Sequence, residues 1–514
     1  LDVYVNDVKV AGLDTVTTDE ISAEAGTGAE ITGAAEGDYA GLAVAAGDFN
    51  GDGHTDLAIG APGTGDNDGA VYVIYGEEGG IPDVDLSDIA DGEGGFMVSP
   101  ETSSDDAFLG ESVTFGDVNG DGLDDLVVGA TNQDDGEGAA YVILGTDETL
   151  EEVSLDEVAE GNGGYKISFE NGNDETYVGV SVATLDMNGD GYDEVAVSNW
   201  PDDDDGEVFV VLGSDEVPDS VDLADIAEGD GGFAYTSEGE ALGDSIATGD
   251  INGDGLEDLV IGAEYANEND TTDDAYVSGA AYIVYGAEDL PDVSAPINIA
   301  ESVDGESVVE INGATDGRET GFSVATGDVN GDGHDDVLLQ SLTGYTVDDV
   351  EVSGSAYVVL GSDNLAATVE LDDVSDGVGG YEISFEDTSS VVYMETVASS
   401  DLNGDGYDDL LITGFSFTDD TYESWESSVY VVFGQEETPA SMTFETIEAG
   451  VGGFVIEDSG SETILGSEGA VQGGFDLNDD GLEDFIAGAP VPSGYTDTSE
   501  TYVVYGSTDW EDFA

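Results

Sequence analysis

The apolar positions of this chain fall into short runs that recur in a fixed order. A first run, led by glycine, reads GLAVAAGD (41–48), GESVTFGD (110–117), GVSVATLD (179–186), GDSIATGD (243–250) and GFSVATGD (321–328). In the first unit, the second run is DLAIGAP at 56–62 and the third run is GAVYVIYG at 69–76. Because the runs are short, rich in Val, Ile and Tyr and bounded by Gly, they predict β-strands rather than helices.

A fourth, weaker run completes six of the units, as in GGFMVSPE at 94–101. The seventh unit ends near residue 514 without such a run, and the missing pattern stands at the other end of the chain, GAEITGAA at 28–35. A repeat of this kind predicts an all-β fold, a seven-bladed β-propeller of four-stranded antiparallel blades. The N-terminal strand closes the last blade, and closure hides the sheet edges.

We assign residues 26–514 to this propeller and residues 1–25 to an N-terminal extension or linker. Within the extension, LDVYVNDVKVAG at 1–12 alternates between apolar and polar residues as a strand does. Two interpretations stay open. The segment is either a linker to another domain or a strand donated to a neighbouring subunit.

A polar nonapeptide joins the first run to the second in every unit. The seven copies are DFNGDGHTD (48–56), DVNGDGLDD (117–125), DMNGDGYDE (186–194), DINGDGLED (250–258), DVNGDGHDD (328–336), DLNGDGYDD (401–409) and DLNDDGLED (476–484). Oxygen atoms at positions 1, 3, 5 and 9 and the carbonyl of position 7 converge when Gly at position 6 allows a sharp turn. Ligands that are all oxygen, in a tight loop, suit Ca²⁺ better than Zn²⁺.

The expected metal ligands of the first loop are Asp48, Asn50, Asp52, the carbonyl of His54 and Asp56. The equivalent residues of the other loops are Asp117, Asn119, Asp121, Leu123, Asp125, Asp186, Asn188, Asp190, Tyr192, Glu194, Asp250, Asn252, Asp254, Leu256, Asp258, Asp328, Asn330, Asp332, His334, Asp336, Asp401, Asn403, Asp405, Tyr407, Asp409, Asp476, Asn478, Asp480, Leu482 and Asp484. We expect about seven calcium ions as structural staples, with affinities of about 10⁻⁴–10⁻³ M. The alternative is that the loops are merely acidic turns.

The charge of the chain changes the choice of partners. The chain has 121 acidic residues and only three basic ones, Lys9, Lys166 and Arg318, which gives a formal net charge of −118. Nucleic acid and anionic membranes are therefore poor partners. Concentrated salt would screen the repulsion, so the composition favours a saline environment over an acidic calcium protein of ordinary surroundings. Cys is absent, which excludes disulfides and thiolate metal sites.

The repeat now permits a comparison with a known family. Gly-x-Ser-Val-Ala, D-x-N-G-D-G-x-x-D, D-L-x-x-G-A-P and V-Y-V-x-x-G together resemble the FG-GAP repeat of integrin α-subunit propellers, in particular its prokaryotic secreted versions, over about residues 28–510. The resemblance implies calcium on one rim of the propeller and ligands on the opposite face. It also implies an extracellular or cell-surface location in a prokaryote, and the acidic composition predicts that this prokaryote is halophilic.

Catalysis is poorly provided for, because both histidines, His54 and His334, fall at loop position 7. We therefore expect a non-enzymatic protein that mediates adhesion or binds a matrix, glycan or protein ligand. The alternative is a structural subunit of a surface filament or S-layer-like assembly. The longer loops between second and third strands carry aromatic residues that are candidates for ligand binding. The alternative is that these side chains pack over the blades as a lid. The residues are Tyr265, Tyr276, Tyr345, Phe417, Tyr422, Trp425 and Tyr495.

Overall fold

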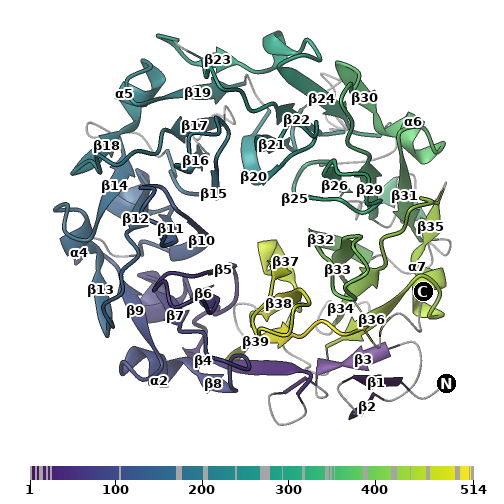
Figure 1. Cartoon of the computed structure of the whole chain (residues 1–514), viewed down its shortest axis with the longest axis horizontal. Coiled ribbons are helices and arrows are strands. Elements are labelled where there is room, and N and C mark those ends of the chain that lie inside the picture. The colour runs from purple at the N-terminus through teal and green to yellow at the C-terminus, as the bar shows by residue number, and fades with distance from the viewer. Residues whose placement is uncertain are drawn as a thin grey trace.

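The structure is a computed structural model of the 514-residue chain. It describes residues 3–5, 8–10, 15–18, 21–22, 26–102, 106–169, 176–200, 206–237, 240–266, 278–291, 293–314, 319–341, 346–347, 350–351, 354–385, 392–417, 425–439, 441–458, 463–491, 498–508 and 510. Seven sheets stand around a central axis like blades, which confirms the predicted seven-bladed β-propeller (Figure 1).

The strands of each sheet are given in chain order within a unit, with the outermost strand last. The first sheet contains β5 (Val44–Gly47), β6 (Asp56–Gly60), β7 (Val71–Ile74), β9 (Gly95–Ser99) and β13 (Glu152–Ser154). The second contains β10 (Leu109–Gly116), β11 (Asp125–Ala130), β12 (Ala139–Ile143), β14 (Gly164–Ser168) and β18 (Ser220–Asp222). The third contains β15 (Val182–Leu185), β16 (Glu194–Asn199), β17 (Glu207–Val211), β19 (Gly232–Thr236) and β23 (Ile297–Asn298).

The remaining sheets repeat this arrangement. The fourth contains β20 (Leu242–Gly249), β21 (Asp258–Ala263), β22 (Ala280–Val284), β24 (Val308–Asn312) and β30 (Thr368–Glu370). The fifth contains β25 (Val324–Gly327), β26 (Asp336–Ser341), β29 (Ser355–Val359), β31 (Gly380–Ser384) and β35 (Met442–Thr443). The sixth contains β32 (Val392–Ser400), β33 (Asp409–Phe417), β34 (Trp425–Val432), β36 (Gly453–Glu457) and β3 (Thr15–Thr17). The seventh contains β37 (Val471–Phe475), β38 (Asp484–Ala489), β39 (Thr498–Val504), β4 (Gly28–Glu36) and β8 (Val84–Asp85).

Each blade has the four antiparallel strands that the sequence predicts, and a fifth strand that it does not. The fifth strand is only two or three residues long and runs parallel to the fourth, as where Val153 of β13 pairs with Val98 of β9. It comes from the next unit in the ring, whose chain crosses to the neighbouring blade between its own third and fourth strands. The extra strand covers the outer edge of each sheet.

The N-terminal segment closes the ring as predicted and does more than predicted. Strand β4 pairs antiparallel with β39, with Tyr502 opposite Glu30. Strand β3 pairs in parallel with β36, with Val16 opposite Ile456, and so covers the sixth sheet. Because β3 lies inside residues 1–25, the propeller begins before residue 26, where the sequence had placed its boundary. Residues 15–36 supply both outer strands that the seventh unit lacks at the C-terminal end of the chain.

Strands β1 (Val3–Val5) and β2 (Val8–Val10) pair with each other as an antiparallel hairpin outside the ring, with Tyr4 opposite Lys9 (Figure 1). A second small hairpin, β27 (Thr346–Val347) with β28 (Val350–Glu351), lies in the fifth unit. Strand donation by residues 1–12 to a neighbouring subunit stays a prediction.

The hydrophobic core lies between neighbouring blades, and short helical turns contribute buried side chains to it. The turns are α1 (Thr64–Asn67), α2 (Leu86–Ala90), α3 (Gln133–Gly136), α4 (Leu155–Val158), α5 (Leu223–Ala227), α6 (Leu371–Ser375), α7 (Phe444–Glu448), η2 (Ala300–Ser302) and η3 (Ser467–Gly469). In α2 the Asp85 side chain caps the amide of Ser87, and Leu86 and Ile89 are buried. Of the helices in the described part of the chain, none has the length and apolar character needed to span a membrane.

Candidate metal centre

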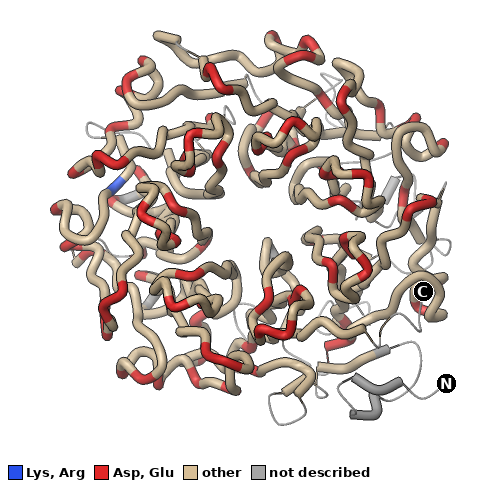
Figure 2. Tube along the Cα trace, in the orientation of Figure 1, with Lys and Arg blue, Asp and Glu red and all other residues tan. Residues whose placement is uncertain are grey.

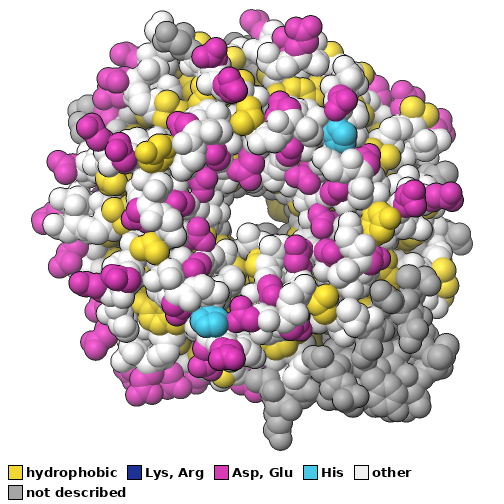
Figure 3. Space-filling view, viewed as in Figure 1, with side chains coloured by type: hydrophobic (Ala, Val, Ile, Leu, Met, Phe, Trp, Pro, Cys, Tyr) yellow, Lys and Arg dark blue, Asp and Glu magenta, His cyan; other side chains and the backbone are white. Residues whose placement is uncertain are grey.

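The seven nonapeptides form the hairpin loops between the first and second strands of the blades. In the first blade, β5 ends at Gly47 and β6 begins at Asp56, so only the last loop residue belongs to a strand. Acidic residues mark the inner turns of the blades all around the ring (Figure 2). Both histidines of the chain belong to such loops, and two histidine side chains are seen among acidic ones on the face shown in Figure 3. The loops therefore open to one face, as the sequence predicts.

The residue at position 1 organises each loop. In the first loop, Asp48 Oδ1 accepts a hydrogen bond from the amide of Asp52 at 3.1 Å, and Asp48 Oδ2 accepts one from Gly53 at 3.0 Å. The amide of Asp52 also lies 2.9 Å from Asn50 Oδ1. Gly53 has φ +89°, a left-handed conformation that glycine adopts without strain. The side chains at positions 1 and 3 thus point into the turn rather than into solvent.

The carboxylate at position 9 is completely buried in all seven loops. These residues are Asp56, Asp125, Glu194, Asp258, Asp336, Asp409 and Asp484, each with 0% exposure. In the first loop, Asp56 Oδ1 accepts a hydrogen bond from Gly76 at 2.8 Å. Burial, followed by the charges of Asp52 and Asp48, raises the pKa of Asp56 to about 7 against the opposing effect of this bond.

The same cause acts in the other loops. Burial raises the pKa to about 7 at Asp125 and Asp258, and to about 8 at Glu194, Asp336 and Asp484. It raises the pKa of Asp409 well above its ordinary value. A buried carboxylate beside two further carboxylates is expensive unless a cation is present.

The donor atoms of a loop fit an oxygen-ligated dication. Asp56 Oδ2 is buried and has no hydrogen-bond partner among the described residues. No group of three or more Asp, Glu, His or Cys side chains is preassembled as a metal cluster in that part of the chain. A loop site of this kind also draws on an Asn oxygen and a backbone carbonyl, which Asn50 and His54 supply. The chemistry of the donor set therefore fits Ca²⁺.

The sequence-based assignment left out position 8, which joins neighbouring loops. Asp124 Oδ2 accepts a hydrogen bond from the amide of Asp48, 76 residues earlier, at 2.7 Å. The same bond recurs from the amides of Asp117, Asp186, Asp250, Asp328 and Asp401 to Asp193, Glu257, Asp335, Asp408 and Glu483, at 2.7–2.8 Å. We call this bond the carboxylate clamp. Its sequence signal is an acidic residue at position 8 in six of the seven loops, with Thr55 as the exception.

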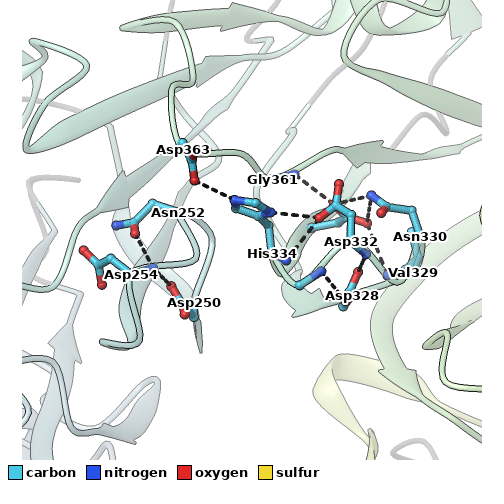
Figure 4. A network of polar contacts seen from close by, with 12 residues as sticks. Asp250, Asn252, Asp254, Asp328, Val329, Asn330, Asp332, His334, Gly361 and Asp363 are labelled. Atoms are coloured by element: carbon cyan, nitrogen blue, oxygen red, sulfur yellow. Dashed lines mark hydrogen bonds and ion pairs between the residues drawn. The ribbon is translucent and has the colours of Figure 1, made fainter.

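The side chain at position 7 also has a role besides the expected carbonyl ligand. It lies over the glycine at position 4 of the preceding loop, where a Cβ on Gly51 would come within 2.2 Å of Leu123 Cδ2. His334 lies over Gly253 in this way. Its Nδ1 is 2.9 Å from Asp332 Oδ1 and its Nε2 is 3.0 Å from Asp363 Oδ1, contacts that raise its pKa (Figure 4). Both imidazole nitrogens of His334 are thus engaged in loop contacts.

The candidate ligand-binding residues are only partly described. Tyr265 follows β21, and its ring centroid lies 6.4 Å from that of Trp200. Trp425 begins β34 and donates its Nε1 hydrogen to the carbonyl of Thr463 at 2.7 Å. Phe417 is described only as the last residue of β33. Tyr276, Tyr345, Tyr422 and Tyr495 lie outside the described residues. Tyr265 belongs to the fourth blade and Trp425 to the sixth, and the contacts described above do not bring these two side chains together.

A central channel of about 590 Å³ is lined by the first strands of all seven blades and is open in Figure 3. Three acidic side chains, Glu111, Asp244 and Glu395, line it from alternate blades. Burial raises the pKa of Asp244 to about 7. Burial first, and the Asp244 charge second, raise the pKa of Glu264 to about 8. This acidic pair was not singled out from the sequence.

Comparison with known proteins agrees with the geometry. The FG-GAP repeat family matches residues 40–74, 109–143, 242–284, 320–359 and 395–432. Integrin alpha pat-2 of Caenorhabditis elegans is 27% identical over 258 residues, covering 46% of this chain and 18% of that protein. Integrin alpha-4 of Xenopus laevis is 29% identical over 181 residues, covering 34% of this chain and 16% of that protein.

A third relative is named as an enzyme. Phosphatidylinositol-glycan-specific phospholipase D of Rattus norvegicus is 38% identical over 117 residues, covering 21% of this chain and 13% of that protein. The matches thus span less than a fifth of the length of these relatives. Among solved structures, the Dos1 propeller covers 93% of this chain and 95% of its own, with 11% identity and a TM-score of 0.40. A mutant AofleA from Arthrobotrys oligospora covers 77% and 83%, with 8% identity and a TM-score of 0.32.

The matched repeats coincide with the first, second, fourth, fifth and sixth units of the ring. The third unit, in which Ser198-Asn199-Trp200 replaces Gly-Ala-Pro, and the seventh unit, which has three additional residues before Asp476, lie outside the matched ranges. Their blades nevertheless have the same five strands as the others. The chain is a seven-bladed β-propeller in which five units match the FG-GAP repeat, and its sequence is similar to that of integrin α-subunits.

Proposed function

We propose that this chain is a calcium-stabilised extracellular propeller that binds a protein or glycan ligand, in adhesion or matrix contact, in saline surroundings. The observation that carries the calcium part is the set of seven fully buried carboxylates at loop position 9, from Asp56 to Asp484, each within reach of two further carboxylates of its loop. No Lys or Arg is among the residues that hydrogen-bond to these groups in the described part of the chain.

In the first loop, Asp48, Asn50, Asp52, the carbonyl of His54 and Asp56 would hold the ion, and the equivalent residues would do so in the others. The ion supplies two positive charges to a turn that carries three carboxylates. The hydrogen bonds that the backbone amides of Asp52 and Gly53 donate to Asp48 already curl the chain around the place where these oxygens converge. Seven ions at two charges each would change the formal net charge from −118 to −104.

Removal of calcium tests this part directly. Protein in concentrated KCl is treated with EGTA, and metal content and thermal unfolding are compared before and after. We expect about seven calcium ions per chain and a lower Tm after chelation, which Ca²⁺ restores better than Mg²⁺ because Mg²⁺ demands smaller, near-octahedral sites. An unchanged Tm, or a metal content near zero in protein purified with calcium, would contradict the proposal.

The saline part of the proposal is supported by charge. Lys166 lies between Glu101 Oε1 at 2.9 Å and Asp134 Oδ2 at 3.0 Å, so this scarce cation is taken up inside the structure. The remaining surface repels itself until dissolved salt shortens the screening length to about 3 Å at 1 M. We expect Tm to rise with KCl up to molar concentrations. Maximum stability in dilute buffer would exclude this environment.

The binding part of the proposal is supported by the fold and the relatives. The loops after the second strands lie on the face away from the acidic hairpins, where Trp200 and Tyr265 form an aromatic pair. We propose that this face binds the ligand and that the protein is not an enzyme, since the imidazoles of both histidines are held in acidic loops. Glycan and protein arrays probed in brine test it. The double variant W200A/Y265A should lose the signal, while Val451→Ala, at a 58% exposed position, should keep it.

The second candidate, a filament or surface-layer subunit, is favoured by the hairpin of β1 and β2 outside the ring (Figure 1). A hairpin leaves strand edges to which a neighbouring subunit can add. Deletion of residues 1–12 should then abolish assembly while the melting curve of the propeller is kept. If the truncated protein assembles like the full chain, hairpin-mediated assembly is wrong.

A further inference from the structure

A cavity lies between the second and third blades on the side of the acidic loops, and the first and second blades show what normally fills such a place. At the first interface, the ring of Phe96 lies 5.2 Å from that of Phe49 and 5.8 Å from that of Tyr75. Tyr75 Oη accepts a hydrogen bond from the amide of Leu150 at 3.2 Å, and Leu150 packs against the same core. Three rings and a leucine therefore fill the first interface.

The equivalent positions at the next interface are smaller. Val118 stands for Phe49, Leu144 for Tyr75 and Pro218 for Leu150, while Tyr165 keeps the ring of Phe96. Loss of two rings removes much apolar volume, and the chain does not collapse to compensate. Val217 and Leu212 are each 39% exposed, so two of the few exposed large apolar side chains of the described residues meet here.

The resulting cavity has a volume of about 470 Å³, which is suitable for a small organic ligand. Its apolar part is formed by Val118, Tyr165, Leu212, Val217 and Ile226. It lies where β14, β17, β18 and α5 meet, in the outer part of the ring between the second and third sheets (Figure 1).

The border of the cavity is acidic. Glu216, Asp222, Asp225 and Asp230 line it, and no Lys, Arg or His does so among the described residues. Glu216, Asp225 and Asp230 are exposed, so their charges face the entrance from solvent. An apolar pocket with this border selects against anions and favours a cationic group next to an apolar one.

We infer that this cavity binds a small aromatic amine, a molecule with a phenol-sized ring and a positively charged amino group. The ring takes the place that the Tyr75 ring occupies at the first interface, over the side chain of Tyr165. The amino group remains at the entrance near Glu216 and Asp230. This site is separate from the aromatic face proposed for the ligand and does not depend on it.

Calorimetry with three probes tests ring and charge separately. Tyramine has both groups, p-cresol has the ring alone, and 4-hydroxyphenylacetate has the ring with a negative charge. The full chain, with calcium and in concentrated KCl, should bind one tyramine. It should bind p-cresol about tenfold more weakly and 4-hydroxyphenylacetate more weakly still, which corresponds to the loss of one favourable charge contact. Equal binding of the three probes, or no saturable binding of tyramine, would overturn the inference.

Variants then place the site. Val217→Trp should fill the cavity, since Trp510 occupies the equivalent position of the seventh unit with 3% exposure. Tyramine affinity should fall by about tenfold or more. Val378→Trp, the same change at a 63% exposed position of the fifth unit, should leave affinity unchanged. If V217W binds tyramine like the unmodified chain, the cavity is not the site.

A double variant tests the assigned site if V217W does not give a cooperative melting curve. The double variant E216Q/D230N changes only exposed side chains and keeps the cavity shape. It should weaken tyramine binding several-fold and leave p-cresol binding unchanged. Equal loss for both probes, or no loss for tyramine, would contradict the assigned role of the acidic border.

Discussion

The Nδ1 atom of His54 lies 2.6 Å from Asp479 Oδ2, and this contact joins the first loop of the chain to the last. At the other six interfaces, the position 7 side chain lies over a glycine at position 4 and a carboxylate clamp holds the loop amide. At the seam between the seventh and first blades, Asp479 replaces the glycine and Thr55 replaces the clamp carboxylate. The seam thus has a contact between two partly exposed side chains, His54 and Asp479, and lacks the half-buried clamp carboxylate of the other interfaces.

The first prediction concerns this seam pair. His54→Leu introduces the residue found at position 7 of three other loops, and Asp479→Gly restores the common glycine, which also relieves the left-handed φ of 60° at Asp479. We expect each single variant to change Tm slightly and the double variant to change it by less than the sum, because the pair contributes only when both partners are present. Additive changes in a thermal double-mutant cycle would show that the contact does not stabilise the seam.

The second prediction adds the missing clamp. Thr55→Asp places a carboxylate where Asp124, Asp193 and Asp335 stand in other loops and offers an acceptor to the amide of Asp476. A hydrogen bond to a charged acceptor contributes about 1.5–3 kcal/mol, and repulsion from nearby carboxylates subtracts from it. We expect a higher Tm in concentrated KCl, where repulsion is screened, and a smaller gain in dilute buffer. A lower Tm at high salt would contradict the role of the clamp.

The third prediction removes a clamp. Asp124→Asn puts an amide in place of the carboxylate oxygen that accepts from Asp48 at 2.7 Å. We expect a loss of about 1–3 kcal/mol in the free energy of unfolding, measured by denaturant titration with calcium present. Glu148→Gln, at an exposed position of the same unit, removes the same charge without a clamp and serves as the control.

The sequence predicted the blades and the clasp because both depend on patterns within one unit. Short apolar runs and Gly-Asp turns identify β5 and β6 locally, and the surplus strand at 28–35 had only one place to pair. The fifth strands escaped prediction since they are two or three residues long, partly exposed and paired with another unit, as Glu152 with Met97. The clamp escaped for a related reason. In a chain with 121 acidic residues, nothing but the fold brings Asp124 to the amide of Asp48.

The fourth prediction distinguishes the contribution of calcium to stability from that of the metal-free fold. Asp336→Asn keeps an oxygen that can accept from Gly361, now at 2.8 Å, but removes a buried charge. Without calcium, the variant should be at least as stable as the unmodified chain, because burial raises the pKa of Asp336 to about 8 and so disfavours its charged form. With saturating calcium the order should reverse. Melting curves with and without calcium measure this, and parallel curves would mean that Asp336 does not sense the ion.

The last prediction concerns pH and the carboxyl groups of Asp244, which lines the central channel, and Glu264. Burial raises the pKa of Asp244 to about 7 and, with the Asp244 charge, that of Glu264 to about 8, against ordinary values of 3.8 and 4.5. Between these limits the folded chain holds protons that the unfolded chain has released, so the free energy of unfolding falls as pH rises from about 4 to 8.

The double variant D244N/E264Q keeps the shape of both side chains and cannot titrate, so its stability should fall less over this range. Calcium is kept saturating, so that titration of the loop carboxylates contributes little to the difference. We expect the variant to be the more stable protein at pH 8 and to lose this advantage at pH 5, where the native pair is protonated when folded. Denaturant titrations of both proteins at the two pH values measure the effect. A constant difference between the two proteins would mean that neither carboxyl group changes its proton affinity on folding.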